Sequence, residues 1–188
     1  RHTTDPYLHA HRIGGLLAEP GHHPVLHRRP QQQHGPGEQH LLFNHPATTE
    51  INTNLPRYVV SRVLEGMNDR GKPLKGSKVL VLGVAYKPDI DDVRESPAMD
   101  VIGLLQKKGA IVEYHDPYIP HIHHEYDGWR MDSVEDMMKS VKEADAVVIV
   151  TNHKQYDYKA IIEASKFVFD SRNATGKFGK YHEKVERL

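Results

Sequence analysis

Continuous apolar runs alternate with amphipathic stretches from residue 51 to the end of the chain. The clearest runs cover residues 78–84 (KVLVLGV) and 144–150 (ADAVVIV), and further strands are predicted at 111–115, 129–131 and 167–169. A run of β-branched and aliphatic residues without alternation is typical of a strand that is buried on both faces, as in parallel sheets. The five predicted strands would lie in the order 3-2-1-4-5 if the sheet follows a common doubly wound arrangement.

Helical stretches separate these strands. One helical face collects the apolar residues Val60, Val63, Leu64 and Met67, which have the i, i+3, i+4, i+7 spacing of an amphipathic helix. Each predicted helix begins at a residue that can cap its first turn: Asn54 before Pro56, Ser96 before Pro97, Asp132 with Glu135, and Asp157. This alternation predicts an α/β fold, a doubly wound and mostly parallel Rossmann-like sheet preceded by a linker helix.

The first part of the chain has a different composition. Residues 1–50 hold most of the fifteen histidines and half of the twelve prolines, and no window of them keeps an apolar period. Frequent proline and glycine interrupt helices and strands. We therefore divide the chain into an irregular or non-native segment (1–50), an amphipathic helix (51–73) and a Rossmann-like ligand-binding domain (74–188).

Composition and charge exclude several classes of function. The 25 basic and 25 acidic side chains balance, so no net field recruits nucleic acid or an acidic membrane. The absence of cysteine excludes a disulfide framework, a cysteine-ligated zinc site and a thiol nucleophile from this chain. No apolar run approaches the roughly 20 residues of a membrane span. We expect a cytoplasmic protein with neither a nucleic acid nor a membrane as its partner.

The fold predicts where a ligand would bind. In a doubly wound sheet the ligand lies beyond the carboxyl ends of the strands, at the point where strand order reverses. Here that point falls between the first and fourth strands, and the loop that leaves the first strand has no glycine-rich dinucleotide fingerprint. Three cations from separate loop positions, Lys87, Arg94 and Arg172, could instead neutralise a diphosphate.

Other uses of these residues stay open at this stage. Lys87 and Arg94 are surrounded in sequence by acidic residues, so both could form ion pairs within a solvated loop. Tyr86 could stack on a base or fill the edge of the core, and His153 could contact a ligand or occupy a turn. The clustered histidines are capable of binding metal, but their spacing does not aim them together, and we predict no metal site.

Three segments resemble a known family. They are residues 83–97 (GVAYKPDIDDVRESP), 114–118 (YHDPY) and 170–173 (DSRN), and they closely resemble the C-terminal domain of the UDP-glucose/GDP-mannose dehydrogenase family. Residues 50–60 (EINTNLPRYVV) are most similar to the UDP-N-acetylglucosamine 6-dehydrogenase branch. The resemblance covers roughly residues 50–175.

The resemblance implies a function for the candidate residues. Enzymes of the family oxidise the C6 hydroxyl of a nucleotide sugar to a carboxylate in two NAD-dependent steps. By resemblance, Tyr86, Lys87 and Arg172 would contact the UDP moiety of the UDP-sugar, and Arg94 would reach toward NAD. The full-length enzyme would be a homo-oligomer, residues 51–73 would belong to its linker helix, which is used in dimerisation, and residues 74–188 would form its UDP-binding domain.

The chain departs from the family pattern before residue 50. It shows neither the NAD-binding domain nor the catalytic cysteine of the family, so it contains no catalytic residue and we expect the isolated chain to be inactive. The function predicted is therefore the UDP-binding C-terminal part of an NAD-dependent UDP-sugar 6-dehydrogenase. The alternatives are a non-catalytic nucleotide-sugar-binding or dimerisation module and, more weakly, a histidine-rich metal-binding protein.

Overall fold

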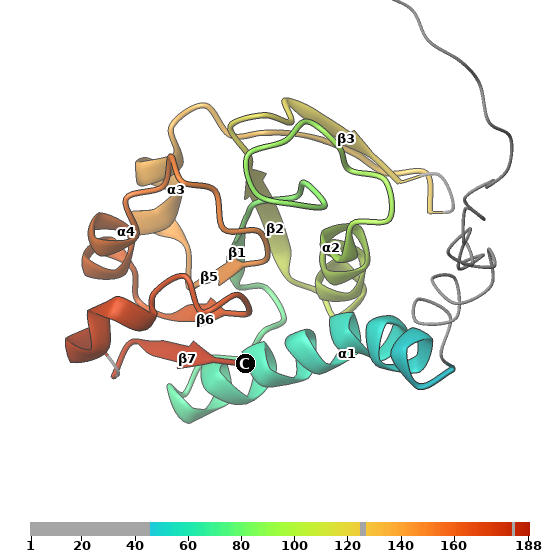
Figure 1. Ribbon diagram of the computed structural model, residues 1–188. Coiled ribbons are helices and arrows are strands. Elements are labelled where there is room, and N and C mark those ends of the chain that lie inside the picture. The colour runs from blue at the N-terminus through green and yellow to red at the C-terminus, as the bar shows by residue number, and fades with distance from the viewer. Residues whose placement is uncertain (1–45, 125–126, 182) are drawn as a thin grey trace, which may run out of the picture. The chain divides into compact units, whose positions relative to one another are not determined.

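A central parallel sheet organises the protein in the computed structural model, which describes residues 46–124, 127–181 and 183–188. Five strands lie in the order β2-β1-β5-β6-β7, and every neighbouring pair is parallel (Figure 1). Their bounds are β1 Lys78–Leu82, β2 Ile111–His115, β5 Ala146–Ile149, β6 Val168–Asp170 and β7 Val185–Arg187. The predicted α/β Rossmann-like fold is confirmed. The predictions for residues 1–45 lie outside the described residues.

The predicted strand order is wrong at both ends of the sheet. The segment predicted as the third strand is β4, Arg130–Asp132, which pairs antiparallel with β3, His121–His123, in a separate two-stranded sheet. Each of these strands has one central apolar residue, Ile122 or Met131, and these two residues lie opposite one another. At the other end β7 adds a strand that was not predicted, because Val185 is its one apolar residue and gives no run to detect.

The helices cover both faces of the sheet. They are α1 Pro46–Asp69, α2 Pro97–Lys107, α3 Met137–Glu143 and α4 Tyr158–Ala164, followed by the 3₁₀ segment η1 Gly176–Tyr181. Residues of α1 and α2 pack in one hydrophobic cluster, and those of α3 and α4 pack in a second. Figure 1 shows α3 and α4 together on the side of the sheet away from α2, with α1 running beside β7.

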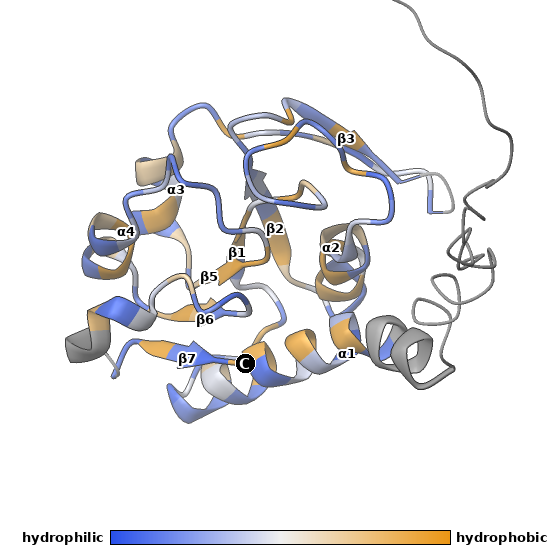
Figure 2. Ribbon diagram, viewed as in Figure 1, coloured by the Kyte–Doolittle hydropathy of each residue, from blue (hydrophilic) through white to orange (hydrophobic). Residues whose placement is uncertain are grey.

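The strands supply alternate side chains to these two clusters. Val79 and Val81 of β1 lie in the cluster with α1 and α2, whereas Leu80 and Leu82 lie in the cluster with α3 and α4. All four are at most 1% exposed. In Figure 2 the hydrophobic colour is concentrated in these central strands. Burial on both faces explains why the strands read as unbroken apolar runs.

The predicted helix caps are correct in two cases and wrong in two. Ser96 caps α2 with Pro97 in the first turn, and Asp157 caps α4 by accepting the Ala160 N–H. α3 is capped by Asp136 rather than by Asp132, which belongs to β4. α1 begins at Pro46, so Asn54 and Pro56 lie inside it, and residues 46–50 are helical rather than irregular. A proline that opens a first turn looks the same in sequence as one inside a longer helix.

Candidate functional site

A pocket of about 440 Å³ lies beyond the carboxyl ends of the parallel strands. Its lining comes from α1, from the loop between β1 and α2, from the first turn of α2 and from the turn after β6: Leu55, Tyr86, Lys87, Glu95, Pro97, Asp100 and Arg172. Three of the four candidate residues, Tyr86, Lys87 and Arg172, are therefore brought together. β1 and β5 are neighbours, as the predicted switch point required.

The two cations of this pocket have no carboxylate partner among the described side chains. Lys87 and Arg172 are both exposed, and the Lys87 ammonium lies 5.4 Å from the centre of the Tyr86 ring. Tyr86 is itself 42% exposed, so it does not fill the core. Two cations that form no ion pair within the described part of the chain are available to an anionic ligand in this pocket, which Glu95 and Asp100 also line.

Arg94 lies outside this pocket. Its Nε and Nη2 atoms donate to the two carboxylate oxygens of Asp92 at 3.0 and 2.9 Å, and its side chain is 86% exposed. These hydrogen bonds, with that from the Arg94 backbone N–H, lower the pKa of Asp92 to about 2, and the same pairing raises the pKa of Arg94. Of the two alternatives left open by the sequence, the structure shows Arg94 in an ion pair within a solvated loop. A contact with NAD stays a prediction.

The start of the Lys87 loop is fixed by the neighbouring strands. Gly83 leaves β1 with φ +79°, and the backbone N–H groups of Val84 and Ala85 donate to Asp116 Oδ2 at 2.7 and 3.0 Å. The Thr151 hydroxyl, at the end of β5, donates to the Ala85 carbonyl at 2.6 Å. The loop therefore leaves β1 in a single direction, toward the pocket.

Asp116, just beyond β2, is a buried acceptor for several backbone groups. Its Oδ2 accepts from the two N–H groups of the Lys87 loop, its Oδ1 accepts from Tyr118 and Ile119, and His153 Nε2 lies 2.9 Å from Oδ2. Burial by itself would raise the pKa of this carboxyl group. The hydrogen bonds from His153 and from the backbone outweigh burial and hold the pKa below its ordinary value.

Asp170, at the end of β6, is a second buried acceptor for backbone N–H groups. Its Oδ1 accepts from the backbone N–H groups of Arg172 and Ala174, and its Oδ2 accepts from the Thr175 N–H and hydroxyl. Asn173, within this turn, has a left-handed φ of +53°. The turn that presents Arg172 is therefore closed around a buried carboxylate.

Sequence reasoning missed Asp116 and Asp170 as organisers of the site and left His153 open between a turn and a ligand contact. His153 is fully buried, lies within hydrogen-bond distance of Asp116 and does not line the pocket. A signal was present, since both aspartates come directly at the carboxyl end of a predicted parallel strand, where the site was expected. What the sequence does not reveal is that these carboxylates point inward.

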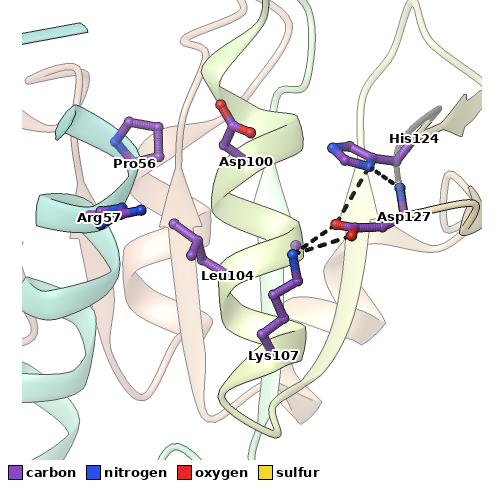
Figure 3. A pocket seen from close by; sticks show the side chains of 8 residues that line it. Pro56, Arg57, Asp100, Leu104, Lys107, His124 and Asp127 are labelled. Carbon is purple, nitrogen blue, oxygen red and sulfur yellow. Dashed lines mark hydrogen bonds and ion pairs between the residues drawn. The ribbon is translucent and has the colours of Figure 1, made fainter. Parts of the chain in front are cut away.

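A second pocket, of about 350 Å³, lies between α1, α2 and the hairpin of β3 and β4 (Figure 3). The Lys107 ammonium and the Asp127 carboxylate are 3.0 Å apart on its wall, and Arg57 of α1 also lines it. Within the described ranges, no group of three His, Cys, Asp or Glu side chains is arranged to hold a metal ion. None of the described helices combines the length and apolar character of a membrane span.

Comparison with known proteins finds relatives of the part of the chain that contains the pocket loops. The family model of the UDP-glucose/GDP-mannose dehydrogenase family, UDP binding domain, matches residues 80–177, which include Tyr86, Lys87 and Arg172. This chain belongs to that family. The match covers the C-terminal, UDP-binding domain, as the resemblance of the sequence predicted.

Individual members of the family match the same part of the chain. The chain is 33% identical to the UDP-N-acetyl-D-mannosamine dehydrogenase of Campylobacter jejuni over 57% of this chain and 26% of the relative. It is 34% identical to the UDP-glucose 6-dehydrogenase of Rhizobium meliloti over 58% of this chain and 24% of the relative. The solved UDP-D-ManNAc dehydrogenase of Pyrococcus horikoshii superposes with a TM-score of 0.56 at 26% identity, over 66% of this chain and 28% of that one.

The chain thus spans about a quarter of the length of these curated relatives. Their names divide between two UDP-sugars, UDP-N-acetyl-D-mannosamine and UDP-glucose. The branch predicted from residues 50–60, UDP-N-acetylglucosamine 6-dehydrogenase, stays a prediction.

Proposed function

We propose that this chain is the UDP-binding part of an NAD-dependent UDP-sugar 6-dehydrogenase, and that Tyr86, Lys87 and Arg172 hold the UDP moiety. The reaction of the whole enzyme would oxidise the C6 hydroxyl of the sugar to a carboxylate. The observation that supports the proposal most directly is the meeting of Lys87 and Arg172 in one pocket within the family's UDP-binding domain.

The chemistry of the pocket suits a nucleoside diphosphate. An ammonium and a guanidinium, presented from the loop after β1 and from the turn after β6, can bind separate oxygens of a diphosphate. The exposed ring of Tyr86 offers a face for a base or a ribose. On the α2 side, the Glu95 and Asp100 carboxylates can accept hydrogen bonds from hydroxyl groups.

The described residues do not form a dinucleotide site of their own. After β1 the chain continues as Val84, Ala85 and Tyr86, without the glycine turn that brings backbone amides against a pyrophosphate. Arg94, the residue assigned to NAD by resemblance, is paired with Asp92 and stands away from the pocket. In this proposal NAD is bound mainly outside the described residues, and the chain has no cysteine to act as nucleophile.

Isothermal titration calorimetry with UDP tests the proposal. The wild-type chain should bind UDP, and Lys87→Ala and Arg172→Ala should each weaken binding by about tenfold or more, because each removes a charge-assisted hydrogen bond. Uridine, which lacks phosphate, should bind weakly and equally to all three proteins.

Arg94→Ala provides the matched control, since it removes a cation from the same loop that does not line the pocket. Wild-type protein that releases no heat with UDP would refute the proposal. A turnover assay with a UDP-sugar and NAD tests the predicted inactivity of the isolated chain, and reduction of NAD would contradict it. The cytoplasmic location, the homo-oligomer and the dimerising role of residues 51–73 stay predictions.

A further inference from the structure

A buried carboxylate–imidazole pair connects three segments beneath the Lys87 loop. The side chains of Asp116, after β2, and His153, after β5, are both fully buried. His153 Nδ1 accepts the backbone N–H of Asp89 at 2.9 Å. A neutral imidazole that accepts at Nδ1 bears its proton on Nε2, so His153 donates from Nε2 to Asp116 Oδ2 at 2.9 Å. The imidazole therefore links the loop to the ends of two strands.

Asp89 occupies a conformation that needs outside support. Its φ of +62° lies in the left-handed region, where residues other than glycine are strained. The backbone N–H of Asp89 is held by His153, and its Oδ1 accepts the backbone N–H of Lys154 at 2.9 Å. Both bonds come from the segment after β5. This segment therefore sets the backbone conformation two residues beyond Lys87.

The first half of the loop is held by the same pair. Asp116 Oδ2, which accepts from His153, also accepts from the N–H groups of Val84 and Ala85. The segment that includes Tyr86 and Lys87 is thus fixed before and after these residues by one connected hydrogen-bond network. Neither Asp116 nor His153 lines the pocket. Any effect of the pair on a ligand must pass through the loop.

We propose that His153 is a positioning residue for diphosphate binding, and that it acts as the acceptor of the Asp89 N–H to keep Lys87 in the pocket. The inference rests on the function proposed above. Without the Nδ1 acceptor, the Asp89 N–H would lose its partner and the strained backbone would relax toward a negative φ. Lys87 would then sample positions outside the pocket, and UDP would have to select the bound one.

Two substitutions of His153 separate its two hydrogen bonds. Glutamine can place an amide N–H near the position of Nε2 and so keep the bond to Asp116, but it has no acceptor at the position of Nδ1. Asparagine can place its carbonyl oxygen near the position of Nδ1 and so accept from Asp89, but it does not reach Asp116. The two variants therefore have similar polarity and opposite expected effects on the loop.

UDP affinity by calorimetry and amide exchange by NMR are measured on the full chain. His153→Gln should weaken UDP binding about fivefold, the effect of one lost hydrogen bond of ordinary strength, and should speed exchange at the Asp89 amide. His153→Asn should restore much of that affinity and slow Asp89 exchange again, although its unfolding midpoint falls below that of the glutamine variant. A purely structural role would make affinity follow the unfolding midpoint instead.

The outcomes distinguish the two proposals. If the wild-type protein binds UDP and His153→Gln binds it within about twofold of the wild-type affinity, this inference is overturned and the proposed function stands. Equal loss of affinity in both variants overturns the route through Asp89. Wild-type protein that does not bind UDP overturns the proposed function and this inference with it. If His153→Gln does not fold, hydrogen exchange of the Asp89 amide is measured in the wild-type protein with and without UDP. Slower exchange on adding UDP supports the inference, and unchanged exchange overturns it.

Discussion

The exit of β1 into the Lys87 loop depends on a close approach between two strand ends, and Gly83→Ala tests it. Gly83 has φ +79°, and a Cβ added there would overlap the backbone oxygen of Thr151 and lie 2.7 Å from its Cβ. Real Cβ atoms essentially never come so close. The end of β1 and the end of β5 must therefore separate to accept the methyl group.

The expected cost follows from the contacts that such a separation breaks. A non-glycine residue in the left-handed region costs about 1–2 kcal/mol. The Val150 N–H donates to the Leu82 carbonyl at 2.9 Å and the Thr151 hydroxyl donates to the Ala85 carbonyl at 2.6 Å, and each such bond contributes about 1 kcal/mol. Gly83→Ala should therefore lower the free energy of unfolding by about 3–4 kcal/mol and the melting temperature by about 10 °C.

Urea unfolding followed by circular dichroism measures this loss, and Gly76→Ala is the matched control. Gly76 has nearly the same φ, +81°, but nothing lies within 4 Å of an added Cβ. The control should lose about 1–2 kcal/mol, the conformational cost alone. The difference between the two variants isolates the steric term. Equal losses would show that the strand ends do not approach each other as the structure has them, and would refute the reasoning.

Two further substitutions test the electrostatics of the site. Asp116→Asn should lower the free energy of unfolding at pH 7 by about 3 kcal/mol, because it removes a buried, fully hydrogen-bonded carboxylate. The pKa of Asp116 is lowered in the fold, so its stabilisation is present above the unfolded pKa of about 3.9 and is lost as pH falls through the folded pKa. Unfolding at pH 7, 4 and 3 should show a weaker acid dependence in the variant, and an unchanged slope would contradict this assignment. Arg94→Ala should leave UDP affinity within about twofold of wild type, because its partner is the exposed loop residue Asp92; a tenfold loss in calorimetry would place Arg94 at the ligand after all.

The sequence predicted the parts of the fold whose signal is local. β1 and β5 are buried on both faces, and this burial requires the unbroken apolar runs that identify them. β3, β4 and β7 have three residues each and a single buried or partly buried apolar position, so β3 and β7 were not predicted and β4 was predicted only as a short strand. The position of β4 in the sheet order was wrong for the same reason, since pairing partners of short polar strands are decided by tertiary packing.

For the site, topology predicted more than side-chain chemistry did. The loops that bear Lys87 and Arg172 were expected to meet because carboxyl ends of parallel strands share one edge of the sheet. Whether a cation in such a loop forms an ion pair was left open by the sequence. In the structure the two cations of one loop differ, since Arg94 pairs with Asp92, whereas Lys87 has no carboxylate partner among the described residues and lines the pocket. The sequence does not distinguish a loop aspartate that faces water from one that accepts five N–H groups, as Asp116 does.

The balance of charge in the chain explains how a neutral protein presents cations to a ligand. Four aspartates in or beside the pocket loops are occupied elsewhere, by backbone N–H groups or by other cations: Asp89, Asp92, Asp116 and Asp170. Because these carboxylates are held in place, none of the four forms an ion pair with Lys87 or Arg172. Glu95 and Asp100 face the same pocket from the side of α2. A lining that has both cations and carboxylates favours a ligand that has both phosphates and hydroxyl groups over a simple anion such as sulfate, which gives the carboxylates nothing to accept.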